Sequence, residues 1–173
     1  MSNTNCFQGS PQKSTSAVVR IVVNDANDNA PVFIKSTFSF FFPENTPVGT
    51  PVVTLNATDP DLGLNGRVKY YLDTDTQDFR LNPDTGLLVV AKTLDREAKE
   101  YYDLTVRAVD GCVESPLSSF AVVRVRVLDV NDVTPEFSAK IYTVKAREDL
   151  PVGTVVGMVH ATDPDLYQGG KIR

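Results

Sequence analysis

An acidic heptapeptide occurs twice in this chain, and the two copies are 104 residues apart (129 − 25 = 104). The first copy is DANDNAP at 25–31, and the second is DVNDVTP at 129–135. A separation that is shared by independent motifs indicates a tandem repeat. Three other motifs share it: PVGT at 47–50 and 151–154, ATDPDL at 57–62 and 161–166, and a glutamate at Glu44 and Glu148.

The repeat length predicts how the chain divides into domains. A unit of this size is normal for one domain with its own hydrophobic core. We expect residues 1–33 to be the C-terminal remnant of one repeat with its linker, 34–137 to be a complete repeat with its linker, and 138–173 to be the N-terminal part of the next. The chain is therefore expected to be part of something longer. Because neither flanking piece holds enough strands to close a core, we expect only about residues 31–137 to fold stably in isolation.

Composition excludes several classes of protein. The apolar content of 42% argues against disorder, and no apolar run approaches the ~20 residues of a membrane helix. The N-terminal residues lack the basic start and apolar segment of a signal peptide. Thirteen of the 22 acidic residues lie in the acidic motifs, while the 17 Lys and Arg are scattered. This distribution favours cation sites and gives little support to nucleic-acid binding.

The apolar pattern predicts an all-β fold. Residues 102–108 alternate apolar side chains with charged or polar ones, and residues 123–127 alternate valine with arginine, as in an antiparallel sheet with one solvated face. Within 52–57 we expect Val53, Leu55 and Ala57 to share one face. About seven short strands in 100 residues predict a Greek-key β-sandwich of immunoglobulin-like architecture. The remaining strand candidates are 39–42, 67–72, 79–81 and 87–91.

The acidic residues fall at strand ends, and alternate strand ends lie at opposite poles of a sandwich. One set is therefore expected near the second heptapeptide and another near the first. Such groups of oxygen atoms suit the six- to eight-ligand shell of Ca²⁺, and without a cation they would repel one another. The first set is Glu44, Asp95 and Glu97; the second is Asp59, Asp61 and Asp110.

Each of these motifs has a simpler interpretation when it is taken alone. Asp, Asn and Pro are ordinary turn formers, and Pro60 favours extended backbone at Asp59 whether or not a metal is present. Asp95 and Glu97 alone would be a solvated loop. An EF-hand is excluded, because a loop that starts at Asp59 would place Leu64 where the invariant glycine belongs.

Taken together and in order, the acidic motifs resemble the calcium motifs of cadherin extracellular repeats, especially those of long many-repeat cadherins of Fat-like, Dachsous-like or protocadherin type. The resemblance covers nearly the whole chain. It implies Greek-key sandwiches joined end to end by three Ca²⁺ ions per junction, in the ectodomain of a membrane adhesion receptor. The motifs are DANDN at 25–29, PEN at 43–45, DPD at 59–61, DRE at 95–97 and AVD at 108–110.

The resemblance also implies a set of ligands at the second junction. The ligands are side chains from the complete repeat, the linker and the following repeat, together with backbone carbonyls. Two of the carbonyls belong to Val133 and Gly169, which replace Asn29 and Asn65 of the first junction. For the first ion it implies Glu44, Asp95, Glu97 and Asp132; for the second, Glu44, Glu97, Asp129, Asp132, Asp165 and the Val130 carbonyl; for the third, Asn131, Asp163, Asp165 and the carbonyls of Val133 and Gly169.

At the first junction the resemblance implies that only the third ion has all of its ligands in this chain. The first two ions lack the glutamate and DRE residues of the preceding repeat, although the linker residues Asp25 and Asp28 are present. The third-ion ligands are Asn27, Asp59, Asp61 and Asp110, with the carbonyls of Asn29 and Asn65.

No set of residues predicts catalysis. His160 is the only histidine, so a Ser-His-Asp triad would rest on it, and two cysteines with one histidine do not make a four-ligand zinc site. Cys6 and Cys112 occupy nearly equivalent places in different repeats, which argues against a disulfide within one domain. Residues 56–58 (NAT) form a glycosylation sequon on the outward strand face.

The resemblance and the acidic linkers together lead us to expect Ca²⁺-dependent cell–cell adhesion by a rod segment that the ions stiffen, on the extracellular side of the plasma membrane. The expected partner is another cadherin-type ectodomain, with no nucleic acid and no small-molecule substrate. Contact with the membrane is expected only through a transmembrane segment outside this chain. Two alternatives stay open: a non-adhesive spacer or mechanical tether built of the same repeats, and a calcium-binding carbohydrate-recognition sandwich.

Overall fold

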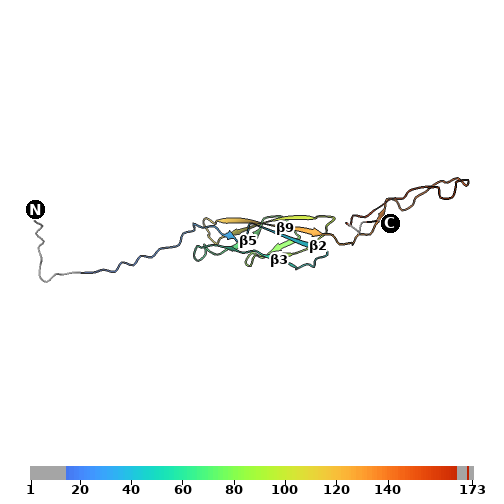
Figure 1. Ribbon diagram of the computed structural model, residues 1–173. Coiled ribbons are helices and arrows are strands. Elements are labelled where there is room, and N and C mark those ends of the chain that lie inside the picture. The colour runs from blue at the N-terminus through green and yellow to red at the C-terminus, as the bar shows by residue number, and fades with distance from the viewer. Residues whose placement is uncertain (1–14, 167–170, 172–173) are drawn as a thin grey trace, which may run out of the picture.

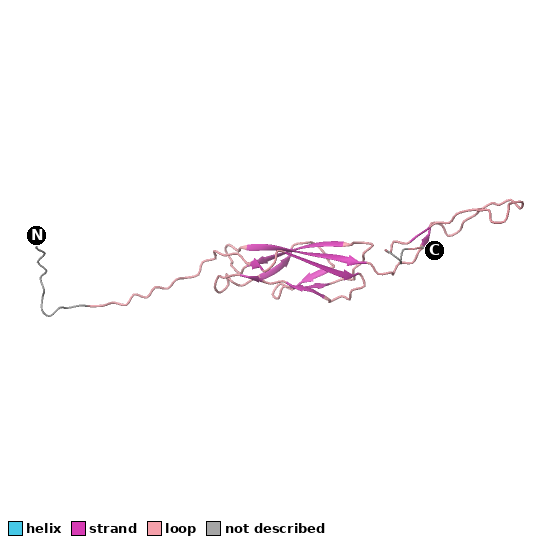
Figure 2. Cartoon of the chain, in the orientation of Figure 1, coloured by secondary structure: helices cyan, strands magenta, loops and turns pink. Residues whose placement is uncertain are grey.

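The computed structural model describes residues 15–166 and Lys171 of the 173-residue chain. A β-sandwich occupies the middle, with extended chain before it and a long, mostly irregular segment after it (Figure 1). The regular elements of the described residues are all strands (Figure 2). They are β1 (Val32–Phe33), β2 (Thr37–Pro43), β3 (Pro51–Thr54), β4 (Ala57–Thr58), β5 (Lys69–Leu72), β6 (Phe79–Leu81), β7 (Leu87–Val90), β8 (Tyr101–Val109), β9 (Ser118–Leu128), β10 (Glu136–Phe137) and β11 (Ala161–Thr162).

The sandwich consists of a four-stranded sheet, in the order β2-β9-β8-β5, and a three-stranded sheet, in the order β3-β7-β6. Together they contain the seven strands that the sequence predicts, so the predicted all-β sandwich is confirmed. The apolar residues of β8 and β9 face inward as predicted, and Leu104, Val106 and Val123 are fully buried. Leu88 and Val90 of β7 are equally buried. Phe79 and Tyr102 join the two sheets edge to face, with their ring centroids 5.0 Å apart.

One strand pair of the four-stranded sheet is parallel, which the alternating pattern did not predict. In this pair β2 runs parallel to β9, with Thr37 beside Val122 and Pro43 beside Leu128. Because the first and last strands run the same way, the chain enters the sandwich at one end and leaves it at the other. We call the entry end the first pole and the exit end, beyond Leu128, the second pole. This topology allows successive repeats to follow one another in a line.

The predicted strand 52–57 is divided into two. Its register with β7 shifts between Pro51 and Val53, which moves Val53 off the buried face and leaves Val52 buried instead. Leu55 still donates to the Gly86 carbonyl (2.8 Å), but Asn56 accepts from the Ile34 N–H (3.2 Å). The chain thus changes its partner from β7 to β1 at Asn56, and β4 then pairs antiparallel with β1.

The flanking segments differ from the sandwich in burial. In the first, Val18 and Ile21 are almost fully exposed, and in the second, Val152 and Met158 are as well. The only pairing of strands after the sandwich in the described residues is that of β10 with β11. Cys6 and Gly169 lie outside the described residues.

Candidate calcium-binding poles

Glu44 is the centre of the second pole. It follows β2 directly and is only 2% exposed. Its Oε2 accepts the Arg96 backbone N–H (2.9 Å) and its Oε1 accepts the Val130 N–H (2.7 Å), so one carboxylate joins the 95–97 loop to the linker. Carboxylate oxygens of Glu44, Glu97 and Asp129 all lie within 4.8 Å of one another. Three carboxylates at such separations form a site of high negative potential.

The remaining predicted residues of the complete repeat lie around this group. Asp95 shapes its own loop, because its Oδ1 accepts the Ala98 N–H (2.9 Å). An open cavity of about 300 Å³ lies between this loop and the linker. Acidic side chains from both sides line it, as the sequence predicts for a cation site. The lining includes Glu44, Asp95, Glu97, Asp132 and Val133.

The segment after β11 brings its own acidic residues to the same pole. Asp165 is 5% exposed and accepts the Val133 N–H (3.2 Å), which joins the linker to the following repeat. Asp163 accepts the Asp165 N–H (3.0 Å). The N–H of Leu166 donates to Asp129 (3.0 Å). The structure therefore brings together predicted ligands from the complete repeat, the linker and the following repeat, whereas Asn131 is exposed.

The first pole is built in a similar way but is richer in amides. Asp110 is 5% exposed and accepts the Leu117 and Cys112 N–H groups, both at 2.9 Å. It also accepts the Asn27 side-chain amide at 3.0 Å. Asp61 accepts both the backbone N–H (3.1 Å) and the side-chain amide (2.6 Å) of Asn29. The linker is thereby tied to the loop that follows β4.

Two further contacts complete the first pole. The Asn65 amide donates to Asp25 (3.0 Å), and Asp59 accepts the Asp61 N–H (3.0 Å). Asp28 lies on the exposed side and accepts from Asn29. The two linker acids thus lie beside the loop of the complete repeat.

Buried oxygens without partners test whether these poles suit a cation. The described residues contain six buried side-chain N or O atoms that lack a hydrogen-bond partner. Four of the six are oxygens of predicted calcium ligands, and a buried polar atom without a partner is costly. Two belong to each pole, so oxygen ligands for a hard cation are present at both. They are Asn27 Oδ1, Asp59 Oδ2, Asp129 Oδ1 and Asp165 Oδ1.

The acid–base properties of the two poles differ. At the second pole, burial together with neighbouring carboxylates raises the pKa of Asp132, and burial together with Glu44 raises that of Glu97. At the first pole, burial alone would raise the pKa of Asp110. The hydrogen bonds from Leu117, Cys112 and Asn27 together outweigh burial and lower it. The second pole therefore holds an excess of negative charge, whereas Asp110 is already stabilised as an anion.

Sequence reasoning missed the part that Arg96 plays. Its guanidinium is an ion-pair partner of Glu97, and Nε lies 2.7 Å from Asp129 Oδ1 without hydrogen-bond geometry. The sequence signal for this role was the position of Arg96 between Asp95 and Glu97 in the DRE motif. Reasoning also missed Gly66, where a Cβ atom would lie 2.0 Å from the Asp61 carbonyl oxygen. The loop between Asp61 and Gly66 closes only because this residue has no side chain.

Comparisons with known proteins identify the family. A family model, the cadherin domain, matches residues 38–128, which is more than half of the chain. The chain belongs to the cadherin family, as its motifs predicted. Cadherin domains are adhesion repeats without enzymatic activity, in agreement with the prediction of no catalytic residues.

Long cadherins are among the most similar relatives. The chain is 43% identical over 166 residues to Protocadherin Fat 1 of Homo sapiens, which covers 95% of the chain and 4% of that protein. It is 45% identical over 166 residues to the Fat-like cadherin-related tumor suppressor homolog of Drosophila melanogaster, with the same two coverages. The chain thus spans a small fraction of the length of these relatives.

Solved structures agree with the fold. Mouse Cadherin-23 EC22-24 has a TM-score of 0.81 and 37% identity, and the match covers 85% of this chain and 47% of that one. Protocadherin Gamma B7 extracellular cadherin domains 1-4 has a TM-score of 0.75 at the same identity, with coverages of 85% and 36%. In the described residues we find no helix of the length and apolarity that a membrane span requires.

Proposed function

We propose that this region is a segment of a cadherin ectodomain that Ca²⁺ stiffens, and that it contributes to cell–cell adhesion on the extracellular side of the plasma membrane. The observation that carries the proposal is the placement of four buried oxygens of predicted ligands without a hydrogen-bond partner, two at each pole; of these, Asp129 Oδ1 has an ion-pair contact with Arg96. Ordinary turns would leave such atoms in water or hydrogen-bonded. The partner that we propose is another cadherin-type ectodomain.

The residues at the second pole support three separate Ca²⁺ sites. Glu44 and Glu97, with Asp95 and Asp132, would hold the first ion; the mutual proximity of Glu44, Glu97 and Asp129 supports the second. The contact of Asp165 with Val133 supports a third that is shared with the following repeat. When bound, Ca²⁺ would supply positive charge that neutralises these carboxylates.

The complete repeat with its linker, 34–137, is the domain unit that we propose, flanked by parts of its neighbours at 1–33 and 138–173. The parallel arrangement of β2 and β9 supports this division, because it places the two linkers at opposite poles. The chain's own residues then orient successive repeats. Glu44 holds the linker through Val130, and Asp165 holds it from the other side through Val133.

Calorimetric Ca²⁺ titration of the chain tests the sites. We expect saturable binding with a dissociation constant of about 10⁻⁴–10⁻³ M and a raised melting temperature. Asp132→Asn should weaken binding, whereas Asp103→Asn, on the exposed outer face of β8, is the matched control. Equal Ca²⁺ affinity of the wild type and of the Asp132→Asn variant would contradict the assignment.

Bead aggregation with the whole ectodomain tests adhesion separately. Beads coated with the ectodomain should aggregate in Ca²⁺ and disperse in chelator, and Asp132→Asn should reduce aggregation. If deletion of residues 34–137 leaves aggregation unchanged, the repeat acts as a spacer or tether and the adhesive part of the proposal is wrong.

A further inference from the structure

The sequon at 56–58 is the one Asn-X-Ser/Thr sequence with X other than proline in the chain, and it contains none of the proposed calcium ligands. The side chains of Asn56 and Thr58 are exposed, and Ala57 between them is buried. Both side chains that define the sequon therefore point away from the core. The Ala57 N–H is held by the Tyr70 hydroxyl at 2.9 Å, which fixes this orientation.

The fold uses the backbone of Asn56 rather than its side chain. The Asn56 carbonyl accepts the Ile34 N–H at 3.2 Å. In the following repeat, 104 residues later (160 − 56 = 104), the His160 carbonyl accepts the Ser138 N–H at 2.9 Å. The same backbone bond thus forms with a different side chain, which shows that the fold does not require asparagine here. The sequon is an addition that is particular to this repeat.

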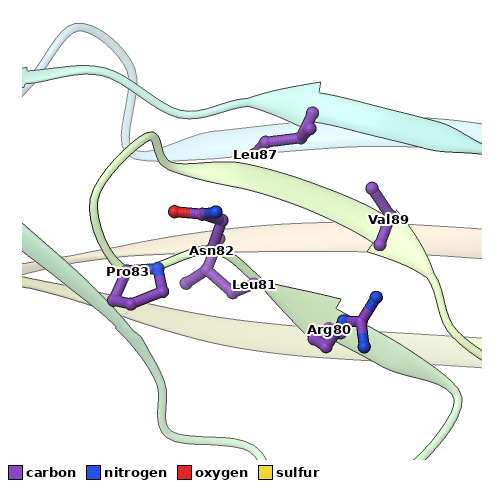
Figure 3. Close-up of a pocket in the computed structure, with 6 residues that line it drawn as sticks. All are labelled: Arg80, Leu81, Asn82, Pro83, Leu87 and Val89. Atoms are coloured by element: carbon purple, nitrogen blue, oxygen red, sulfur yellow. The ribbon is translucent and has the colours of Figure 1, made fainter. Parts of the chain in front are cut away.

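The surroundings of Asn56 leave room for a bulky group. Thr54, two residues earlier, is also exposed and pairs with Leu87 of β7. Leu87 lines an open pocket on the three-stranded sheet, which Val89 and Arg80 also line (Figure 3). Asn56 thus projects at the end of β3, next to an open part of the surface.

We propose that Asn56 carries an Asn-linked glycan. This inference rests on the extracellular location in the proposed function, because only chains that enter the secretory pathway are modified in this way. The transfer joins the anomeric carbon of a lipid-diphosphate-linked oligosaccharide to Asn56 Nδ2. The Nδ2 atom loses one proton, and the lipid diphosphate leaves.

Secretion of the chain from cultured animal cells, behind a cleavable leader, tests the proposal. We expect a mass increase that peptide N-glycosidase removes, with conversion of Asn56 to aspartate. Asn56→His, which introduces the residue of the following repeat, and Thr58→Ala should both abolish the mass increase, and Thr58→Ser should retain it. A secreted chain without the mass increase would overturn the proposal, and Ca²⁺ titration of that sample would show separately whether the proposed function holds.

A second, independent observation concerns Arg96. Its side chain is only 10% exposed, although it is charged. It is paired with Glu97 and Asp129, and its NH2 group donates to the Pro164 carbonyl at 2.7 Å. One guanidinium therefore contacts the DRE loop, the linker and the following repeat. Two of its partners belong to the three carboxylates that lie within 4.8 Å of one another.

We infer that Arg96 is a built-in cation at the second pole, which holds Asp129 and the following repeat when Ca²⁺ is absent and competes with the ion for Asp129. This deepens the proposed function and rests on it. A buried arginine neutralises neighbouring carboxylates, as a metal would, but it does not dissociate. Arg96 therefore weakens Ca²⁺ binding, because its ion pair with Asp129 must break before Asp129 can bind the ion.

Substitution of Arg96 by glutamine distinguishes competition with Ca²⁺ from a merely structural role of this side chain. Arg96→Gln should tighten Ca²⁺ binding by about threefold to tenfold, because the charged contact no longer competes. In chelator, the Leu166 amide should exchange its hydrogen faster, because the segment near Pro164 is no longer held. Arg124→Gln, an equal change of charge on the exposed face of β9, should alter neither quantity.

Unchanged Ca²⁺ affinity in Arg96→Gln, with normal affinity in the wild type, would overturn the competition while leaving the calcium sites intact. Absence of Ca²⁺ binding in the wild type would instead contradict the proposed function. The two failures are therefore distinguishable in a single set of titrations.

Discussion

The two poles of the sandwich hold similar numbers of acidic residues but stabilise them differently. At the first pole, amides and backbone N–H groups contact the carboxylates, and the pKa of Asp110 is lowered. At the second pole, carboxylates face one another, the pKa values of Glu97 and Asp132 are raised, and the nearest positive charge is Arg96. Among the residues of this chain, mutual repulsion of carboxylates is therefore greater at the second pole than at the first.

Part of this difference arises because this chain holds a glutamate and a DRE motif before the second linker only. The rest follows from which side chains accompany the acids. The first linker carries Asn27 and Asn29, whose amides donate to Asp110 and Asp61. The second linker has Val133 where the first has Asn29, and there the Asp165 carboxylate receives only a backbone N–H from the linker. Without Ca²⁺, we expect the contacts of Asn27 and Asn29 to hold the first pole, and those of Arg96 with Asp129 and Pro164 to be the main charged contacts that hold the second.

Removal of Asp110 should have the largest effect on stability. Asp110→Ala leaves the partly buried N–H groups of Cys112 and Leu117 without their acceptor and removes one of the two acceptors of the Asn27 amide, so the unfolding free energy in chelator should fall by about 2–4 kcal/mol. Urea denaturation measures this loss. A loss below about 0.5 kcal/mol would mean that water replaces the carboxylate and that the first pole is not held as we describe.

A methyl group at Gly66 should disturb the first pole alone. Gly66→Ala places a Cβ where the Asp61 carbonyl lies, at a cost of about 1–3 kcal/mol, and should weaken Ca²⁺ binding at that pole. Gly63→Ala is the control, because Gly63 has a positive φ of 65° but no atom near its Cβ position. Equal effects of both variants on Ca²⁺ affinity would contradict the role of the close approach.

The pH dependence of stability in chelator should separate the poles. Because the pKa of Glu97 is raised in the folded state, its protonation favours folding, so stability should rise as pH falls from about 7 toward the ordinary value of 4.5. Glu97→Gln should reduce this rise. Asp110 has a lowered pKa, so it contributes stability above its ordinary value of 3.8 that is lost in stronger acid. An identical pH profile for Glu97→Gln and the wild type would argue against strain at the second pole.

The smallest effect is expected on the exposed face of the four-stranded sheet. The Arg124–Asp103 ion pair is 3.4 Å long and mostly exposed, so Arg124→Gln should change the unfolding free energy by less than about 0.5 kcal/mol. It should leave Ca²⁺ affinity unchanged. An effect as large as that of Asp110→Ala would show that charge alone, rather than position at a pole, governs stability.

Much of the fold could be predicted because its signals are local. The alternation in 102–108 and 123–127 depends only on the period of a strand, and the structure buries Leu104, Val106 and Val123 as predicted. The division of 52–57 could not be predicted, because the register shift depends on competition between β7 and β1 for the same segment. The parallel pairing of β2 with β9 also depends on partners distant in sequence.

The sequence by itself determined the repeat, the strand pattern and the grouping of acidic residues at two poles, since a fixed separation and a period of two need no knowledge of contacts. That the acidic motifs serve as calcium sites stays a prediction. Only the tertiary structure decided which oxygens lack partners and where Arg96 lies. These depend on distances between segments as far apart as Arg96 and Pro164, and such distances exist only after the chain has folded.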